Sequence, residues 1–298
     1  MNMNSKKALI IFNPTAGIVT GSDTLSQVKA YLEQLEYSTE AAILDNHFED
    51  TVAHYDFSDI ALVVAVGGDG TVRVAARTIL EYKISAPLAI IPFGSANVVA
   101  ASLGIPISIK KSLALINNAQ TQKIDVGKID TGEIFLVGFS IGYISKIVTQ
   151  TQGVLKNRFG FLGYIVRFLF NNVPLHRIKF KITCRDKQFY VKGNSLVVFN
   201  AVNIYGIRPK KNISITDGVL NLYVVKNRNF IGLFKIALDF LFYQEPPHHL
   251  FALDGQKFGI DLGPAGDVCQ IDGDLIALGN KIEITIIPQA LSVVVSRS

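Results

Sequence analysis

The chain has 298 residues, of which 49% are hydrophobic and 18% are charged, and this is enough apolar material for two domains or one large one. Such a composition excludes an intrinsically disordered chain. The formal net charge of +5 is compatible with anionic lipid surfaces or nucleic acid, but an ordinary basic surface explains it equally well.

Two sequence features bear on the location of the protein. The longest uncharged run, 84–109, is long enough to cross a bilayer, but it contains three prolines and so predicts strand, loop and short helix. The apolar stretch after Lys7 ends at Asn13-Pro14 and is too short for a signal-peptide core. Cys184 and Cys269 lack metal-ligand spacing and are expected to be buried free thiols. We therefore expect a cytoplasmic protein without a transmembrane helix.

The first part of the chain alternates between apolar runs and helical periodicity. Strands are predicted at 8–12, 41–44, 60–66 and 88–91, and helices at 25–35 and 71–82. The run 60–66 is apolar throughout, as in a parallel strand covered on both faces. This alternation predicts a doubly wound α/β domain.

The pattern changes at a hinge expected near 120–127. Short alternating or apolar runs follow at 123–129, 134–139, 178–184, 196–200, 220–225, 258–262 and 282–286. Two helices are expected among them, at 156–170 and 230–243. This second part predicts an antiparallel β domain with attached helices.

A glycine loop, Gly67-Gly68-Asp69-Gly70-Thr71, lies between a predicted strand and a predicted helix. Glycines allow the backbone to approach a ligand closely, and a helix N-terminus suits phosphate. Asp69 would repel phosphate unless a metal or a catalytic task compensates for its charge. The alternative is an ordinary tight turn between strand and helix.

A second loop follows the next strand and carries Gly94, Ser95 and Asn97. Ligands of doubly wound domains bind beyond the carboxyl ends of the strands, where both loops are expected to lie. Gly94 and Ser95 are candidates to line a nucleotide. Taken alone, Asn97 is better explained as a helix cap.

Seven short segments in order resemble the motifs of the diacylglycerol kinase catalytic family, which includes bacterial lipid kinases and sphingosine kinases. They are Asn13–Gly17 (NPTAG), Gly67–Thr71 (GGDGT), Gly94–Asn97 (GSAN), Ile124–Gly127 (IDVG), Phe139–Tyr143 (FSIGY), Asp217–Leu220 (DGVL) and Asp272–Asp274 (DGD). The resemblance implies a Rossmann-like nucleotide-binding α/β domain of 1–123, joined by a returning strand at 288–298. It also implies a β-sandwich lipid-substrate domain of 124–287, with the active site in the cleft between the two.

The resemblance also assigns roles to the residues in these motifs. It implies that ATP is bound by Asn13, Gly67, Gly68, Asp69, Gly70, Thr71, Gly94, Ser95, Asn97 and Asp125. Asp272 would be the general base, with Asp274 beside it, and Asp217 would hold Mg²⁺. Without the resemblance, both Asp-Gly pairs would be interpreted as hairpin turns.

Several positions differ from the family pattern. Arg73, Val74 and Val98 replace polar or acidic family residues, and Asp274 stands where the family has glutamate. These changes remove carboxylates from the nucleotide and metal region. They are the reason for the alternative of a catalytically weak nucleotide or lipid sensor.

The resulting hypothesis is an ATP-dependent and Mg²⁺-dependent lipid kinase that acts at a membrane surface, to which it binds peripherally. No nucleic-acid partner is expected, and exposed strand edges would allow a homodimer. The segment 156–170 is either a membrane-binding helix or part of the core. The alternatives are an NAD kinase and a catalytically weak nucleotide or lipid sensor. A Rossmann oxidoreductase is disfavoured because no GxGxxG follows a strand.

Overall fold

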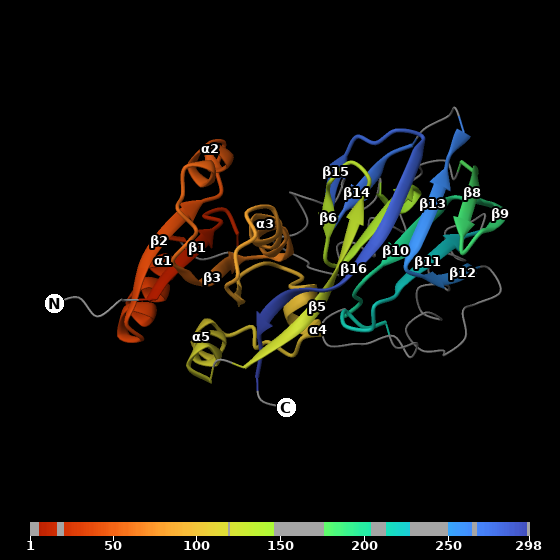
Figure 1. The fold of residues 1–298 in the computed structure, drawn as a ribbon. Helices are drawn as coiled ribbons and strands as arrows, with labels where there is room; N and C mark the ends of the chain where they lie inside the picture. The colour runs from red at the N-terminus through yellow and green to blue at the C-terminus, as the bar shows by residue number, and fades with distance from the viewer. Residues whose placement is uncertain are drawn as a thin grey trace. The chain divides into compact units, whose positions relative to one another are not determined.

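The computed structural model describes residues 6–16, 21–118, 120–145, 176–203, 213–226, 250–263 and 267–296. The chain divides into two compact units, one of Met1–Ile124 with Gln289–Ser298 and one of Asp125–Pro288. It passes from unit 1 to unit 2 within β5 (Thr121–Ile129) and returns within β16 (Lys281–Val294), as the colours of Figure 1 allow the reader to follow.

Unit 1 is built on a parallel sheet in the order β2-β1-β3-β4. Its strands are β1 (Lys6–Phe12), β2 (Tyr37–Ile43), β3 (Ile60–Gly67) and β4 (Leu88–Pro92). Beside β4, the last part of β16 adds a parallel neighbour through the pair Val293 and Leu88. Nearly every side chain of β3 is buried, which is the pattern of a parallel strand covered on both faces.

Helices cover both faces of this sheet. The helices of unit 1 are α1 (Gly21–Gln34), α2 (Phe48–Ala53), α3 (Asp69–Glu81), α4 (Val98–Ser102) and α5 (Ile109–Asn118). One buried cluster joins α1 and α5 to alternate residues of β1 and β3. No residue of α3 belongs to that cluster although α3 packs against β3, so α3 covers the opposite face. This is the doubly wound arrangement expected from the sequence.

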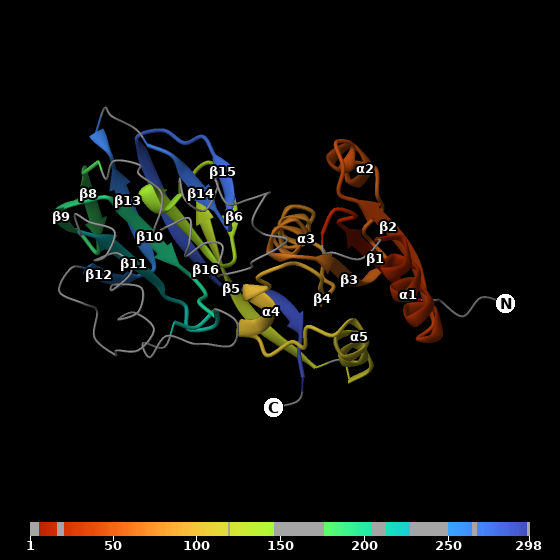
Figure 2. The same ribbon diagram turned by 180° about the vertical axis from the view of Figure 1, so that it is seen from behind.

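Unit 2 contains two antiparallel layers, which Figures 1 and 2 show from opposite sides. The first has the order β12-β11-β10-β7-β14-β15, and the second has the order β16-β13-β8-β9. The strands of the first are β7 (Gly138–Gly142), β10 (Ser195–Phe199), β11 (Leu220–Val225), β12 (Leu250–Gly255), β14 (Cys269–Ile271) and β15 (Asp274–Ile276). Those of the second, besides β16, are β8 (Ile178–Cys184), β9 (Lys187–Gly193) and β13 (Lys257–Asp261).

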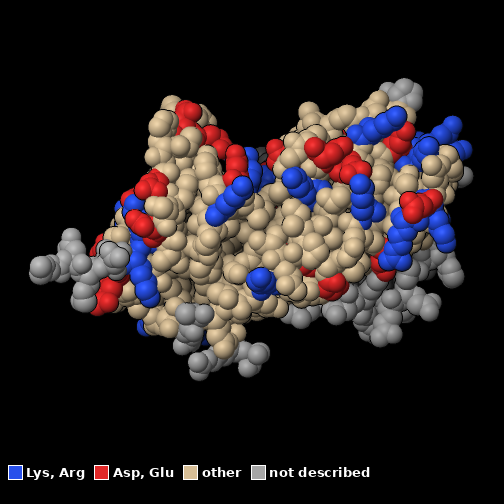
Figure 3. Space-filling view, in the orientation of Figure 1, with Lys and Arg blue, Asp and Glu red and all other residues tan. Residues whose placement is uncertain are grey.

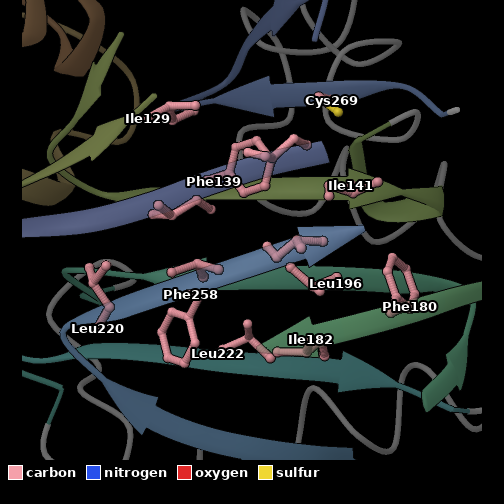
Figure 4. Packing of buried hydrophobic residues seen from close by; sticks show 14 of the residues in the cluster. Ile129, Phe139, Ile141, Phe180, Ile182, Leu196, Leu220, Leu222, Phe258 and Cys269 are labelled. Carbon is pink, nitrogen blue, oxygen red and sulfur yellow. The ribbon is translucent and has the colours of Figure 1, made fainter. Parts of the chain in front are cut away.

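The core of unit 2 lies between these layers. Figure 4 shows Phe139, Ile141 and Leu196 of the first layer packed with Phe180 and Phe258 of the second. Each of these side chains alternates along its strand with residues on the other face, because successive side chains of a strand point to opposite faces. The predicted fold class, a Rossmann-like domain followed by a β-sandwich, is confirmed.

Some expected elements differ from those observed. The strand expected at 134–139 is divided into β6 (Ile134–Phe135) and β7, because the N–H groups of Leu136 and Val137 bind the Asp272 carboxylate instead of a neighbouring strand. The returning strand expected at 288–298 is not a separate element, because β16 continues through Pro288 to Val294 with a left-handed residue at Gln289 (φ 51°).

The helices expected at 156–170 and 230–243 lie outside the described residues. In the part of the chain that is described, no helix has the length and apolar character needed to cross a bilayer. Both cysteines are free and buried, as the sequence predicts.

Candidate active site

Three loops of unit 1 begin at the carboxyl ends of adjacent parallel strands. Asn13 follows β1 and donates its N–H to the carbonyl oxygen of Val66 in β3 at 3.1 Å. Phe93, which follows β4, donates its N–H to the carbonyl oxygen of Gly67 at 2.8 Å. The sheet therefore brings the loops of Asn13, Gly67–Thr71 and Gly94–Asn97 to one edge, where ligands of such folds bind.

The second and third loops are in direct backbone contact. A Cβ atom on Gly94 would lie 2.4 Å from the Cα of Gly68, and a Cβ on Gly68 would lie 3.2 Å from the Cα of Gly94. A Cβ on Gly67 would lie 2.1 Å from Oγ1 of Thr71. Glycine is thus required here for the packing of the loops themselves, and it also leaves their backbone open to a ligand.

Two polar side chains fasten these loops together. The amide of Asn97 accepts a hydrogen bond from the N–H of Gly94 at 3.0 Å and donates one to its carbonyl at 2.8 Å, so it closes its own loop. Asn97 is also the left-handed residue (φ 48°) that precedes α4. The Asp69 carboxylate accepts the N–H of Val99 in α4 at 3.0 Å. Asp69 therefore has a structural task that the sequence did not indicate.

Thr71 is the clearest sign of a ligand in this region. Its side chain is 2% exposed, and its Oγ1 has no hydrogen-bond partner within the described residues. A buried hydroxyl without a partner costs free energy unless something else binds it. It lies in the first turn of α3, whose N-terminal N–H groups and dipole favour phosphate. These features fit a nucleotide phosphate.

The other unit 1 residues predicted for the nucleotide occupy the same loops. The Asn13 side chain accepts hydrogen bonds from the N–H of Thr15 at 2.9 Å and from its hydroxyl at 2.8 Å, and so shapes its own turn. Ser95 is exposed, and Gly70 lies in the first turn of α3.

Asp125 and Asp217 lie close together in unit 2. Asp125 is fully buried, and its Oδ2 accepts the N–H of Gly218 at 2.7 Å. The Asp217 side chain is largely exposed, yet surrounding protein atoms remove enough water to raise the pKa of its carboxyl, and the nearby Asp125 acts in the same direction. A divalent cation would relieve both effects, so the Asp217 carboxylate suits a Mg²⁺ ligand. Within the described residues, no group of three His, Cys, Asp or Glu side chains could hold a metal.

Asp272 and Gly273 form a two-residue hairpin turn between β14 and β15, with φ values of 48° and 101°. The Asp272 carboxylate faces the chain before β7, where Oδ2 accepts the N–H of Leu136 at 2.8 Å. Its Oδ1 accepts the N–H groups of Val137 at 2.9 Å and Gly138 at 2.8 Å. The DG pair is therefore a turn, as its composition suggests, and it also fixes a half-buried carboxylate in position. Asp274 begins β15 with an exposed side chain.

Asn200 was missed by the sequence analysis. It is fully buried, and its Nδ2 donates to the carbonyl of Asp125 at 3.0 Å and to that of Leu136 at 2.9 Å. It thus connects the strand that carries Asp125 with the segment that binds Asp272. An asparagine at the end of an apolar strand was the only available signal.

A second buried network supports the same turn. Gln270 donates to the Ser140 hydroxyl at 2.9 Å and accepts the N–H of Gly273 at 2.6 Å, and the Ser140 and Ser145 hydroxyls are 2.9 Å apart. Ser140 lies in the FSIGY segment but was assigned no role, and Gln270 and Ser145 belong to no motif, because the register of β7 and β14 brings Ser140 and Gln270 together.

Comparison with known proteins decides the family. Residues 7–129 match the model of the diacylglycerol kinase catalytic domain. The family recognition is confirmed. A diacylglycerol kinase of Bacillus subtilis is 26% identical over 236 residues, which are 78% of each chain. A protein of Escherichia fergusonii named "Probable lipid kinase YegS" is 28% identical over 78% of this chain and 77% of that one.

Solved structures agree on the fold. A diacylglycerol kinase of Bacillus anthracis superposes with a TM-score of 0.76 at 21% identity, over 98% of this chain and 97% of that one. Yeast NADH kinase superposes with a TM-score of 0.54 at 9% identity, over 98% of this chain and 84% of that one. Kinases take the phosphoryl group that they transfer from a nucleotide, so the diacylglycerol kinase family implies a nucleotide as one substrate.

Proposed function

We propose that the protein transfers the γ-phosphate of ATP, with Mg²⁺, to the hydroxyl group of a lipid. The observation that carries the proposal is the pair of glycine loops of unit 1, where the Thr71 hydroxyl has no partner among the described residues and lies in the first turn of α3. Such a site suits an anionic phosphate, and the relatives named above as lipid kinases supply the class of acceptor.

In this proposal each residue has a separate task. The backbones of Gly67, Gly68 and Gly94 accommodate the phosphates at close range, and Thr71 donates its hydroxyl proton to a phosphate oxygen. Mg²⁺ would supply neutralisation of the phosphate charge. Asp217 would hold a structural Mg²⁺ ion. Phosphoryl transfer requires mainly such positioning and charge neutralisation.

Asp272 is proposed as the acceptor of the lipid hydroxyl proton. Three backbone N–H donors fix the orientation of this carboxylate. Proton transfer in the transition state requires a group held in a fixed orientation. The proposal needs both the nucleotide site and the base, so a variant that removes either should abolish transfer.

The test is incubation of the protein with labelled ATP, Mg²⁺ and mixed micelles of diacylglycerol, monoacylglycerol, phosphatidylglycerol or a sphingoid base. The Asp272→Asn variant is tested in parallel. Its matched control is Asp186→Asn, the same change in another two-residue turn with a left-handed backbone (φ 62°). Label in one lipid that is lost only in Asp272→Asn, with nucleotide binding retained, is the expected result.

Two other results would replace the proposal. Transfer of label to NAD and to no lipid would identify an NAD kinase, whose fold is similar. Nucleotide binding without transfer to any acceptor would identify a sensor. Loss of transfer in both Asp272→Asn and Asp186→Asn would show that the effect comes from altered turn geometry. Asp272 would then not be the base.

A further inference from the structure

The excess positive charge of the protein is concentrated in one hairpin. The β8–β9 hairpin, residues 177–192, has six Lys and Arg and one Asp, a formal charge of +5. The whole chain has 29 Lys and Arg against 24 Asp and Glu, also +5, so the other residues balance at 23 of each sign. A single supersecondary element therefore accounts for the net charge, which a generic basic surface would spread over the molecule.

The strand register places these charges on one face. Lys179 is opposite Lys192 and Lys181 is opposite Tyr190, whereas Phe180 and Val191 point into the core. Tyr190 is 75% exposed, and the ammonium of Lys181 lies 6.0 Å from the centre of its ring. Figure 3 shows Lys and Arg gathered at the end of unit 2 that holds β8 and β9, with fewer acidic side chains among them.

This arrangement is unfavourable for the fold alone. Like charges directly opposite each other, as in Lys179 and Lys192, destabilise an antiparallel pair. The turn residues Arg185 and Asp186 both have left-handed backbones (φ 47° and 62°), where glycine or asparagine is favoured. Lysines on an edge strand prevent aggregation, but β8 lies inside its sheet, so Lys179 and Lys181 serve no such purpose.

Acidic neighbours neutralise the hairpin only in part. In β13, Asp261 lies beside Lys181, whereas Glu283 of β16 is already paired with Lys257 at 2.8 Å. Among the described residues, no ion pair is formed by Arg177, Lys179 or Lys192. The guanidinium of Arg177 donates to the carbonyl of Lys192 at 3.1 Å, which holds a third cation at this end of the hairpin.

We propose that the outer face of the β8–β9 hairpin binds the anionic surface of a lipid bilayer. Basic side chains near such a surface each add to the binding, and an exposed tyrosine has the amphipathic ring that suits the headgroup region. Four of the six cations are lysines. A lysine ammonium acts as a point charge, which suits an anionic lipid surface, whereas arginine forms the bidentate hydrogen bonds that recognise a single base or phosphate. The link to lipid phosphorylation rests on the proposed function, but the binding itself does not.

The test is co-sedimentation of the full chain with vesicles, without nucleotide. Binding to phosphatidylcholine vesicles that contain phosphatidylglycerol should be strong at low salt and weak at high salt, and binding to phosphatidylcholine alone should be weak. Lys179→Gln with Lys192→Gln should lower the affinity for anionic vesicles roughly 25-fold, since each cation contributes about fivefold. The thermal unfolding temperature should not fall, because the substitution relieves a like-charge pair.

The matched control is Lys110→Gln with Lys111→Gln, which removes the same charge from exposed positions of α5. It should change vesicle affinity by less than about twofold if the hairpin is the binding surface. Equal binding by the hairpin variant and the wild type would overturn the proposal, as would equal binding to neutral and anionic vesicles. Tighter binding to single-stranded nucleic acid at equal phosphate concentration would replace the bilayer as partner. A failed transfer assay with intact vesicle binding would reject only the proposed kinase reaction.

Discussion

The carboxylate of Asp69 accepts a hydrogen bond from the N–H of Val99 at 3.0 Å, across thirty positions of the chain. This bond joins the start of α3 to the start of α4 and holds the two glycine loops together. It satisfies one of the N–H groups that a helix leaves unpaired at its N-terminus. Asp69 can therefore be required for the loop geometry, for the reaction, or for both.

Replacement of Asp69 by Asn separates these roles. The Asn side chain retains an oxygen that can accept the Val99 N–H, so the thermal unfolding temperature should change little. If the negative charge acts on the metal or the nucleotide, transfer to lipid should fall at least about tenfold. Asp69→Ala, which loses the hydrogen bond as well, should also lower stability by about 1 kcal/mol. Full activity in Asp69→Asn would leave only the structural role.

Replacement of Gly94 by Ala tests the contact between the loops. The new Cβ would lie 2.4 Å from the Cα of Gly68, which belongs to the backbone and cannot move aside cheaply. We expect a loss of about 1–3 kcal/mol in unfolding free energy, measured by denaturant titration, and weaker binding of a non-hydrolysable ATP analogue. Gly279→Ala is the control, since the nearest atom to its new Cβ is 4.0 Å away. Normal stability and nucleotide binding in Gly94→Ala would show that the loops separate freely.

Asp217 should give a pH-dependent contribution to stability. Burial and the nearby Asp125 raise the pKa of the Asp217 carboxyl above its ordinary value of 3.8, so the folded chain holds this proton more tightly than the unfolded chain. The stability that the protonated Asp217 carboxyl contributes is therefore fully present below pH 3.8 and is lost as the pH rises through the raised pKa. In metal-free buffer, Asp217→Asn should become more stable than the wild type over that pH range. Addition of Mg²⁺ at neutral pH should stabilise only the wild type.

Asp56 is a control for which the pH dependence of stability should have the opposite sign. Hydrogen bonds from the backbone and side chain of Ser58 lower the pKa of the Asp56 carboxyl. The stability that it contributes is present above the ordinary pKa and is lost as the pH falls through the lowered one. Asp56→Asn should therefore differ from the wild type at neutral pH and converge with it in acid. The same pH trend in both variants would contradict the assignment for Asp217.

The two cysteines should be unreactive in the folded protein. Burial, with a smaller effect of Asp267, raises the pKa of the Cys269 thiol to about 11. At pH 8 a thiol of this kind is ionised on the order of one part in a thousand, and only the thiolate reacts. Burial also raises the pKa of the Cys184 thiol. Mass spectrometry after iodoacetamide treatment should find neither modified in buffer and both modified in denaturant. Rapid labelling in buffer would contradict their burial.

The regular elements were predictable where a local pattern determines them. The apolar run at 60–66 became β3, and the strands at 178–184 and 220–225 were predicted with the observed bounds of β8 and β11. Three-residue strands such as β14 and β15 are too short to show such a pattern, and their pairing partners stabilise them.

The candidate site was predictable only in part. The Gly67–Thr71 and Gly94–Asn97 loops follow adjacent parallel strands, so their proximity follows from the alternation of strand and helix. The three N–H donors to Asp272 lie more than 130 residues before it in the chain, and Asn200 binds carbonyls 75 and 64 residues away. Such contacts depend on the register of distant strands, which composition and periodicity do not encode.

The division of unit 1 into two chain segments has a consequence for synthesis. On the side of β4 away from β3, its sheet is continued by the end of β16, through Val293 and Leu88. A ribosome releases residues in order, so the glycine loops emerge well before the strand that completes their sheet. Unit 1 must wait in an incomplete state, with β4 as an open strand edge, while all of unit 2 is made. We expect nascent chains stalled before residue 289 to be the form of this protein most prone to bind chaperones.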